Sequence, residues 1–426
     1  MNRSGVWARV QLWGLLVLAI GATALATVMF TRGTTSNPAL QTSSPQSSSS
    51  GKSATLTSSK ADNNPHPIAG GFKLNGRVLE ECALTDRPCV EQGFGNLAYR
   101  EGAKVALARF DAMIANSGPV EANCHRIAHT IGSASLARLK ENVGQAFAQG
   151  SSSCWSGYYH GILEHAFLQL KSFEPTEVAA VSQKLCSDAG IRKVSWLAYQ
   201  CVHGLGHGLM ITSGLDLPLS LEICNKLATD WDRQSCKGGV FMENISSSYG
   251  TKSEYLKDSD LIYPCNAIKE GDKLYCYLMV TSRVLNANGY NWDATAKLCK
   301  NGEKDWVKVC FRSYGRDASG SSRLNNAEIL RKCNLSAGAG GLLGCIIGAA
   351  ADITANDTSG SRTAAFCETV PGNFKSVCYW SLGTVSGGFK ASAEERLADC
   401  RSWISAEKMI EACRTGSIGG REPEAI

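Results

Sequence analysis

Six of the seven histidines of this 426-residue chain lie between residues 125 and 207, in three short segments. These segments read CHRIAHTIG, CWSGYYHGILEH and CVHGLGHGLM. The pairs of potential ligands four residues apart are His125 with His129, His160 with Glu164, and His203 with His207. A spacing of four places two side chains on one face of a helix. Imidazoles and carboxylates presented in this way are typical ligands of a metal ion held on rigid elements.

The same segments are in register with the cysteines that open them. His160 and His207 each stand six residues after such a cysteine, and Glu243 stands seven residues after Cys236. Equivalent positions of neighbouring helices then point the same way, so that the side chains meet in one pocket. We predict a metal centre formed by His125, His129, His160, Glu164, His203 and His207, with Glu243 as an added ligand or as a general base.

The donor set indicates a divalent transition metal. Imidazole with carboxylate suits zinc, copper, iron or manganese, whereas a thiolate site is excluded if the cysteines are oxidised. The number of donors is sufficient for two ions. If the protein is an enzyme, the ion would activate water or oxygen through an open coordination position. The sequence has no C-x-x-C-H haem motif, no P-loop, no G-x-S-x-G and no H-E-x-x-H.

A structural role for the histidines is the alternative. A buried histidine is more often a hydrogen-bonded core residue than a ligand, and the glycine-rich HGLGHG stretch could be a tight contact between helices. His165 lies about a quarter-turn from the face that carries His160 and Glu164, so we expect it to support the site rather than to bind metal. His66 lies in a Ser/Thr-rich segment and has no expected role.

The elements that must position these residues are marked by the cysteines. From residue 186 onward the first members of successive cysteine pairs lie 38, 41, 34, 34, 34 and 33 residues apart. A period near 34 predicts a repeated two-helix hairpin. We expect each pair to be a disulfide that joins the two helices and stabilises the hairpin by about 2–3 kcal/mol. The predicted pairs are Cys186 with Cys201, Cys224 with Cys236, Cys265 with Cys276, Cys299 with Cys310, Cys333 with Cys345, Cys367 with Cys378, and Cys400 with Cys413.

The pairing of the four earlier cysteines stays open. These are Cys82, Cys89, Cys124 and Cys154. The first two are close enough in sequence for a local bridge, which would leave the other two as possible partners, but connectivity does not follow from sequence alone.

The repeat length and the hairpin resemble those of tetratricopeptide-type repeats, over residues 186–413. This resemblance implies an α-solenoid with a concave binding surface. The predicted fold is therefore all-α, a disulfide-stapled array of helical hairpins. Its alternative function is that of a non-catalytic scaffold that binds a protein or a glycan on the concave face. Polar residues that would line this face in the later repeats are Arg283, Arg316, Asp317 and Asp352.

Composition and the chain ends bear on the compartment. The 43 Lys and Arg against 38 Asp and Glu give a net charge of only +5, which excludes a typical nucleic-acid-binding protein. Residues 10–31 form an uncharged apolar run that is long enough to cross a bilayer, as a retained anchor or a cleaved signal peptide. Together with 18 cysteines, this run predicts an exported chain on the periplasmic or extracellular side, with the membrane as a partner. The predicted regions are 1–32 anchor or signal, 33–70 flexible linker, 80–250 His-rich helical block, 251–418 Cys-paired hairpins and 419–426 tail.

Overall fold

The computed structural model describes residues 56–58, 64–151, 153–322 and 325–424. Within these residues the chain forms α-helices, short 3-10 helices and their connections, and no β-strand. The all-α fold predicted from the sequence is thereby confirmed. The apolar run at residues 10–31 lies outside the described residues, and none of the described helices is long and apolar enough to cross a membrane.

The first part of the chain contains the elements that carry the histidines. Its elements are η1 (Leu79–Glu81), α1 (Arg87–Glu101), α2 (Ala103–Ile114), α3 (Gly118–Ala122), α4 (Cys124–Arg138), α5 (Val143–Phe147), α6 (Ser153–Phe167), α7 (Pro175–Leu185), α8 (Ala189–Arg192), α9 (Ser195–Thr212), α10 (Leu217–Asn225) and α11 (Asp230–Ile245). Part of the predicted linker packs against this block, because the backbone N–H groups of His66 and Ile68 donate to carbonyls at the end of α9.

The second part of the chain consists of the hairpins. Its elements are η2 (Glu270–Asp272), α12 (Lys273–Ala287), α13 (Trp292–Lys300), η3 (Lys304–Trp306), α14 (Val307–Ser321), α15 (Asn326–Leu335), η4 (Ala337–Ala339), α16 (Leu342–Asn356), α17 (Ser361–Thr369), η5 (Gly372–Phe374), α18 (Lys375–Ser386), η6 (Gly387–Phe389), α19 (Ala393–Trp403) and α20 (Glu407–Ser417). Helix α19 begins with a capping box in which Ser392 and Glu395 satisfy each other's backbone N–H groups.

All 18 cysteines lie within the described residues and form nine disulfides. The two disulfides that the sequence left open join Cys82 to Cys89 and Cys124 to Cys154. Disulfides persist in oxidising compartments, so they indicate an extracytoplasmic environment. The seven pairs predicted from spacing are all present and are confirmed as Cys186 with Cys201, Cys224 with Cys236, Cys265 with Cys276, Cys299 with Cys310, Cys333 with Cys345, Cys367 with Cys378, and Cys400 with Cys413.

One hairpin departs from the predicted pattern. The segment before Cys265 is a series of turns rather than a helix, with a single bridge between Lys257 and Asp260. Arg283 of α12 donates to the backbone carbonyls of Lys257 and Tyr263. The buried side chain of Arg283 therefore holds this irregular segment, and its place on the concave face stays a prediction.

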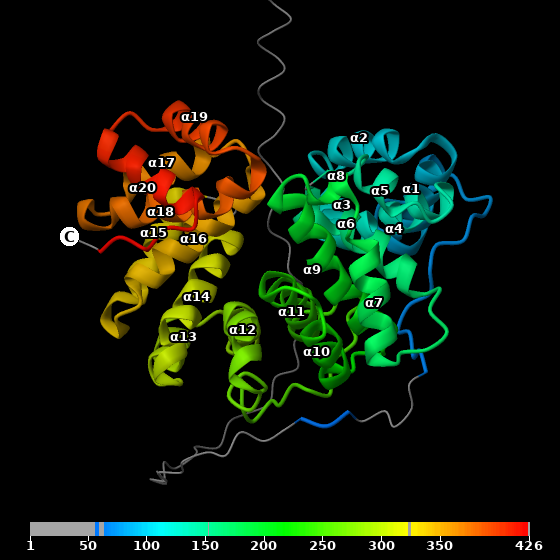
Figure 1. Cartoon of the computed structure of the whole chain (residues 1–426), viewed down its shortest axis with the longest axis horizontal. Coiled ribbons are helices and arrows are strands. Elements are labelled where there is room, and N and C mark those ends of the chain that lie inside the picture. The colour runs from blue at the N-terminus through cyan, green and yellow to red at the C-terminus, as the bar shows by residue number, and fades with distance from the viewer. Residues whose placement is uncertain (1–55, 59–63, 152, 323–324, 425–426) are drawn as a thin grey trace, which may run out of the picture.

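The hairpins succeed one another along the chain in a solenoid-like arrangement. Figure 1 shows the ribbon passing from α1 through α9, α11 and α12 near the middle to α20 on the far side. A late part of the array also contacts an earlier helix. The ring of Phe389 in η6 lies 5.0 Å from that of Trp196 at the start of α9. The N-terminal end of α9 is therefore in contact with the last repeats.

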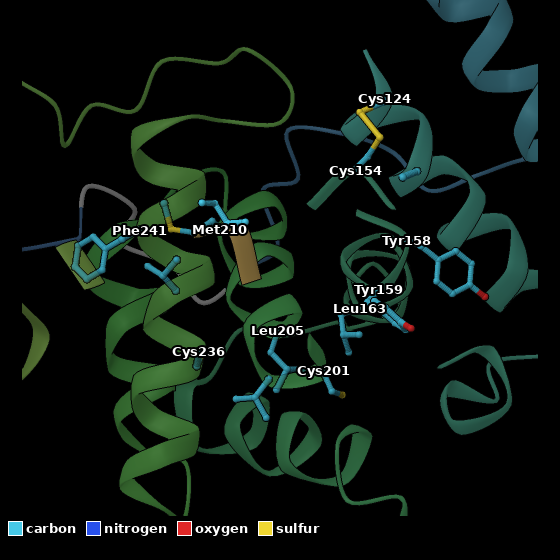
Figure 2. Packing of buried hydrophobic residues seen from close by; sticks show 14 of the residues in the cluster. Cys124, Cys154, Tyr158, Tyr159, Leu163, Cys201, Leu205, Met210, Cys236 and Phe241 are labelled. Atoms are coloured by element: carbon cyan, nitrogen blue, oxygen red, sulfur yellow. A yellow bond between two sulfur atoms is a disulfide. The ribbon is translucent and has the colours of Figure 1, made fainter. Parts of the chain in front are cut away.

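Helices α4, α6, α9 and α11 form a row of parallel neighbours whose backbones approach very closely. A Cβ atom built on Gly161 would lie 1.9 Å from the carbonyl oxygen of His129, and one built on Gly239 would lie 2.0 Å from that of His203. Only glycine fits at such contacts. Leu205 is part of the apolar packing that surrounds α6 and α9 (Figure 2). This close packing sets the register between the helices that carry the histidines.

Candidate metal centre

Five histidines from three neighbouring helices meet in the interior of the row. Helix α4 supplies His125 and His129, α6 supplies His160, and α9 supplies His203 and His207. His125 is partly exposed and the other four side chains are buried. The structure therefore brings together all five histidines that the spacing predicted as ligands.

Two overlapping groups of three have donor atoms close enough to share an ion. The first triad is His125, His129 and His160, and the second triad is His160, His203 and His207. Within each triad the donor atoms lie within 4.8 Å of one another. His160 belongs to both triads. Among the described residues no such group includes Glu164 or Glu243.

In the first triad, hydrogen bonds fix which ring nitrogens face inward. Nδ1 of His125 lies 2.7 Å from the carbonyl oxygen of Cys154 and must donate to it. Nδ1 of His129 lies 3.0 Å from a carboxylate oxygen of Glu164. The two Nε2 atoms face each other at 3.1 Å. When Glu164 is ionised, it accepts a hydrogen bond from Nδ1 of His129. If both rings are neutral, each Nε2 then carries a lone pair, and the two lone pairs face each other.

The second triad has the same arrangement. Nδ1 of His207 donates to a carboxylate oxygen of Glu243 at 2.8 Å, and Nε2 of His207 lies 3.3 Å from Nε2 of His203. Glu243 also accepts hydrogen bonds from the backbone N–H of Ser248 at 2.6 Å and from its hydroxyl at 2.9 Å. Burial tends to raise the pKa of Glu243, but the hydrogen bond and charge of His207 outweigh it and hold the pKa below the ordinary value. Glu243 is therefore the ionised acceptor that orients His207.

His160 lies between the two pairs without a hydrogen-bond partner on either ring nitrogen. Only 1% of its surface is exposed. Its ring centre lies 5.3 Å from that of His125, 5.6 Å from that of His129 and 5.3 Å from that of His203. It stacks on His207 at 4.2 Å with an angle of 14° between the planes. Two unsatisfied buried nitrogens are costly unless a further group binds them.

Burial keeps the histidines in the form that binds metals. It lowers the pKa of His125 and of His129 to about 3, and the pKa values of His160 and His203 fall well below the ordinary value for the same reason. Neighbouring histidines add to the effect, because a second positive charge in the cluster would be repelled. These four rings are therefore neutral near pH 7 and offer lone pairs to a cation.

A loop after α11 closes one side of the cluster. The hydroxyl of Tyr249 donates to Glu164, and the guanidinium of Arg126 lies 4.5 Å from the centre of the Tyr249 ring. Burial raises the pKa of Glu164 to about 7, although the hydrogen bond from Tyr249 lowers it. Sequence reasoning missed Tyr249 and Ser248, because both lie in a loop where no helical spacing relates them to the histidines.

Other histidines and predicted polar residues lie outside the cluster. Nδ1 of His165 is 2.9 Å from the hydroxyl of Ser133, and its Nε2 is 3.3 Å from Glu141, so these contacts lie away from the predicted ligands. Arg316 pairs with the adjacent Asp317 at 3.0 Å in a later repeat.

A cluster of imidazoles with carboxylates and a carbonyl on their outer nitrogens is an arrangement found where histidines bind metals. Comparisons of the chain with protein-family models, with curated proteins and with solved structures give no match. The functional interpretation therefore depends on the geometry of the cluster.

Proposed function

We propose that this protein is an exported metalloprotein that binds a divalent transition metal between α4, α6 and α9. The ligands are the inward-facing nitrogens of His125, His129, His160, His203 and His207. The predicted N-terminal anchor would hold the domain at the outer face of a membrane. Zinc, copper, iron and manganese all suit imidazole ligands.

The observation that carries this proposal is the close approach of paired Nε2 atoms on α4 and on α9, at 3.1 and 3.3 Å. If the ring of His207 is neutral, its Nε2 carries a lone pair and no proton, because the one N–H of the ring is at Nδ1 and donates to the ionised Glu243. Nε2 of His203 lies 3.3 Å away. Two nitrogens bound to one tetrahedral ion are about 3.3 Å apart, given metal–nitrogen bonds of about 2.0–2.1 Å. A cation bound by both nitrogens removes the repulsion between their lone pairs.

The ring positions of the first triad support the same conclusion. Imidazoles bound to one tetrahedral ion have ring centres roughly 5 Å apart for the same bond length. His125 and His129 are 4.6 Å apart, and their distances to His160 are 5.3 and 5.6 Å. Three imidazoles leave a fourth position of a tetrahedral ion open. A bound ion with such a position supplies Lewis acidity and an activated water or oxygen.

The sequence predicted Glu164 as a metal ligand and Glu243 as a ligand or general base, and we propose a different role for both. Each carboxylate lies on the outer nitrogen of a histidine, where it fixes the ring orientation and increases the basicity of the inner nitrogen. We therefore assign Glu164 and Glu243 to orienting the ligands rather than to binding the ion directly.

A metal-free hydrogen-bond chain is the competing explanation in the first triad. If Glu164 were protonated, it could donate to His129, which could then donate from Nε2 to His125. This chain does not explain the two unpartnered nitrogens of His160.

The test is metal analysis of the purified full-length chain, first stripped with a chelator and then reloaded with zinc or copper. We expect at least one ion per chain after removal of unbound metal, and a loss of most of it in His129→Ala/His207→Ala. The matched control is His66→Ala, because His66 is exposed and lies outside the cluster. Less than about 0.3 ion per chain in the natural protein, with folding intact, would overturn the proposal.

A further inference from the structure

We propose that His160 bridges two metal ions, one in each triad, through its two ring nitrogens. This inference rests on the proposed function and adds to it a second metal site and the residue that couples the sites. The first ion is bound by His125 and His129 and the second by His203 and His207, with His160 common to both.

The first argument is the repetition of one local arrangement on the two sides of His160. On each side, two histidines four residues apart on one helix bring their Nε2 atoms to 3.1 or 3.3 Å. On each side Nδ1 of the second histidine lies within hydrogen-bond distance of a glutamate on the next helix of the row, at 3.0 or 2.8 Å. Each pair thus provides two of the nitrogens that an ion needs and lacks a third.

The second argument is the state of His160 itself. Both of its ring nitrogens are buried and neither has a hydrogen-bond partner. The two nitrogens of an imidazole point away from each other, so a single ion can use only one of them. The other would remain buried and unsatisfied, which is unfavourable. Two ions satisfy both nitrogens and supply the missing third ligand to each pair.

The positions of the rings are compatible with this sharing after one adjustment. His160 lies 5.3 Å from both His125 and His203, which belong to opposite pairs. Its stacking on His207 at 4.2 Å must open, because both rings have to direct a nitrogen at the same ion. The two ions would then be roughly 6 Å apart, from two metal–nitrogen bonds of about 2.0–2.1 Å on either side of one ring.

Charge and proton balance also agree with a bridge. A neutral imidazole carries one N–H, so binding of the second ion to His160 breaks that N–H bond and releases one proton to solvent. The ring becomes an imidazolate with one negative charge. No oxidation or reduction is involved.

The experiment uses Cu²⁺ as the probe, because two copper ions joined by an imidazolate are magnetically coupled. The full-length, chelator-stripped chain is titrated with Cu²⁺ and followed by electron paramagnetic resonance at liquid-helium temperature. We expect two copper ions per chain, and a loss of most of the signal as the second ion binds. The variant His203→Ala/His207→Ala should bind one ion and keep its full signal.

The His160→Gln variant is the direct test of the bridge, because a glutamine side chain cannot form the imidazolate that joins the two ions. We expect any copper bound by this variant to give its full, uncoupled signal. Circular dichroism and the melting temperature confirm that each variant is folded. One ion per chain, or two uncoupled ions, in the natural protein would overturn the bridge and leave the proposed function intact. Absence of bound copper and zinc would overturn both.

Discussion

The carboxylate of Glu243 on α11 accepts a hydrogen bond from Nδ1 of His207 on α9 at 2.8 Å. This contact turns Nε2 of His207 toward His203, and in a neutral ring that nitrogen carries a lone pair. Glu164 and His129 repeat the relationship between α6 and α4 at 3.0 Å. The orientation of the candidate ligands is therefore set by residues of neighbouring helices.

The first prediction concerns this orienting contact. Glu243→Gln keeps the shape of the side chain but removes its charge, so we expect metal affinity to fall by about 10- to 100-fold. Competition with a chromogenic chelator would measure the change. The control is Glu222→Gln, whose side chain is 58% exposed and pairs only weakly with Lys226 at 3.6 Å. Equal affinities for the two variants would contradict an orienting role for Glu243.

The second prediction concerns acid stability of the metal-free protein. The folded chain keeps His125 and His129 neutral down to about pH 3, whereas the unfolded chain protonates them below their ordinary pKa of 6.5. The unfolded state thus binds more protons in this window, and the free energy of unfolding decreases as pH falls, by up to about 1.4 kcal/mol per pH unit for each histidine.

Glu164 acts in the opposite direction over part of this range. Its folded pKa of about 7 exceeds the ordinary value of 4.5, so its contribution to stability is lost as pH rises through about 7. The steepest acid destabilisation is therefore expected below pH 4.5. Denaturant titrations from about pH 3 to about pH 8 would measure it. A slope that is unchanged in His125→Asn/His129→Asn would show that these residues are not its source.

The third prediction concerns the close contact between α9 and α11. In Gly239→Ala the new methyl group would meet the carbonyl oxygen of His203 at 2.0 Å, so one helix must move. We expect a loss of about 3 kcal/mol or more in the free energy of unfolding. Gly338→Ala is the control, because nothing lies within 4 Å of the added atom. A destabilisation of similar size in both variants would argue against this contact.

The fourth prediction concerns the loop over the first triad. Tyr249→Phe removes the hydroxyl that donates to Glu164 but keeps the ring beneath Arg126. We expect the pKa of Glu164 to rise further, because that hydrogen bond lowers it, and the protein to lose about 1.5–3 kcal/mol above that pKa. Infrared titration of the carboxyl group would follow the shift.

Tyr290→Phe serves as the control for Tyr249→Phe. The hydroxyl of Tyr290 donates to Asn286 on the surface, and its side chain is 44% exposed. This control should leave the carboxyl titration unchanged. A titration that is also unchanged in Tyr249→Phe would contradict the contact between Tyr249 and Glu164.

The fifth prediction separates two disulfides by their effect on the metal. Replacing either Cys124 and Cys154 or Cys367 and Cys378 by serine should cost about 2–4 kcal/mol of stability. Only the first replacement should also weaken metal binding, because the carbonyl of Cys154 accepts from Nδ1 of His125 at 2.7 Å. Equal metal affinities in the two double variants would contradict this link.

Much of the fold could be predicted because its signals are local. A pair of cysteines 11 to 15 residues apart spans one helical hairpin, so the seven disulfides from residue 186 onward followed from spacing alone. The turns before Cys265 were not predicted. The spacing from Cys265 to Cys276 is that of the other pairs, and it does not distinguish a helix from another compact segment that brings Cys265 to α12.

A non-helical stretch near the start of α6 was also not predicted from the sequence. Cys154, Trp155 and Ser156 have φ values of 52°, 52° and 60°, in the left-handed region that residues other than glycine rarely adopt. No glycine marks these positions. The conformation is maintained by tertiary contacts, including the hydrogen bond that His125 donates to the Cys154 carbonyl.

The sequence by itself determined which histidines could meet, because a spacing of four on a helix and a shared distance from the cysteines place side chains on equivalent faces. It also determined the hairpins that position them, since short cysteine loops impose local order. Only the tertiary structure decided which nitrogen of each ring faces inward. That choice depends on acceptors from other elements, such as Glu164, Glu243 and the Cys154 carbonyl, whose separation in sequence follows no helical period.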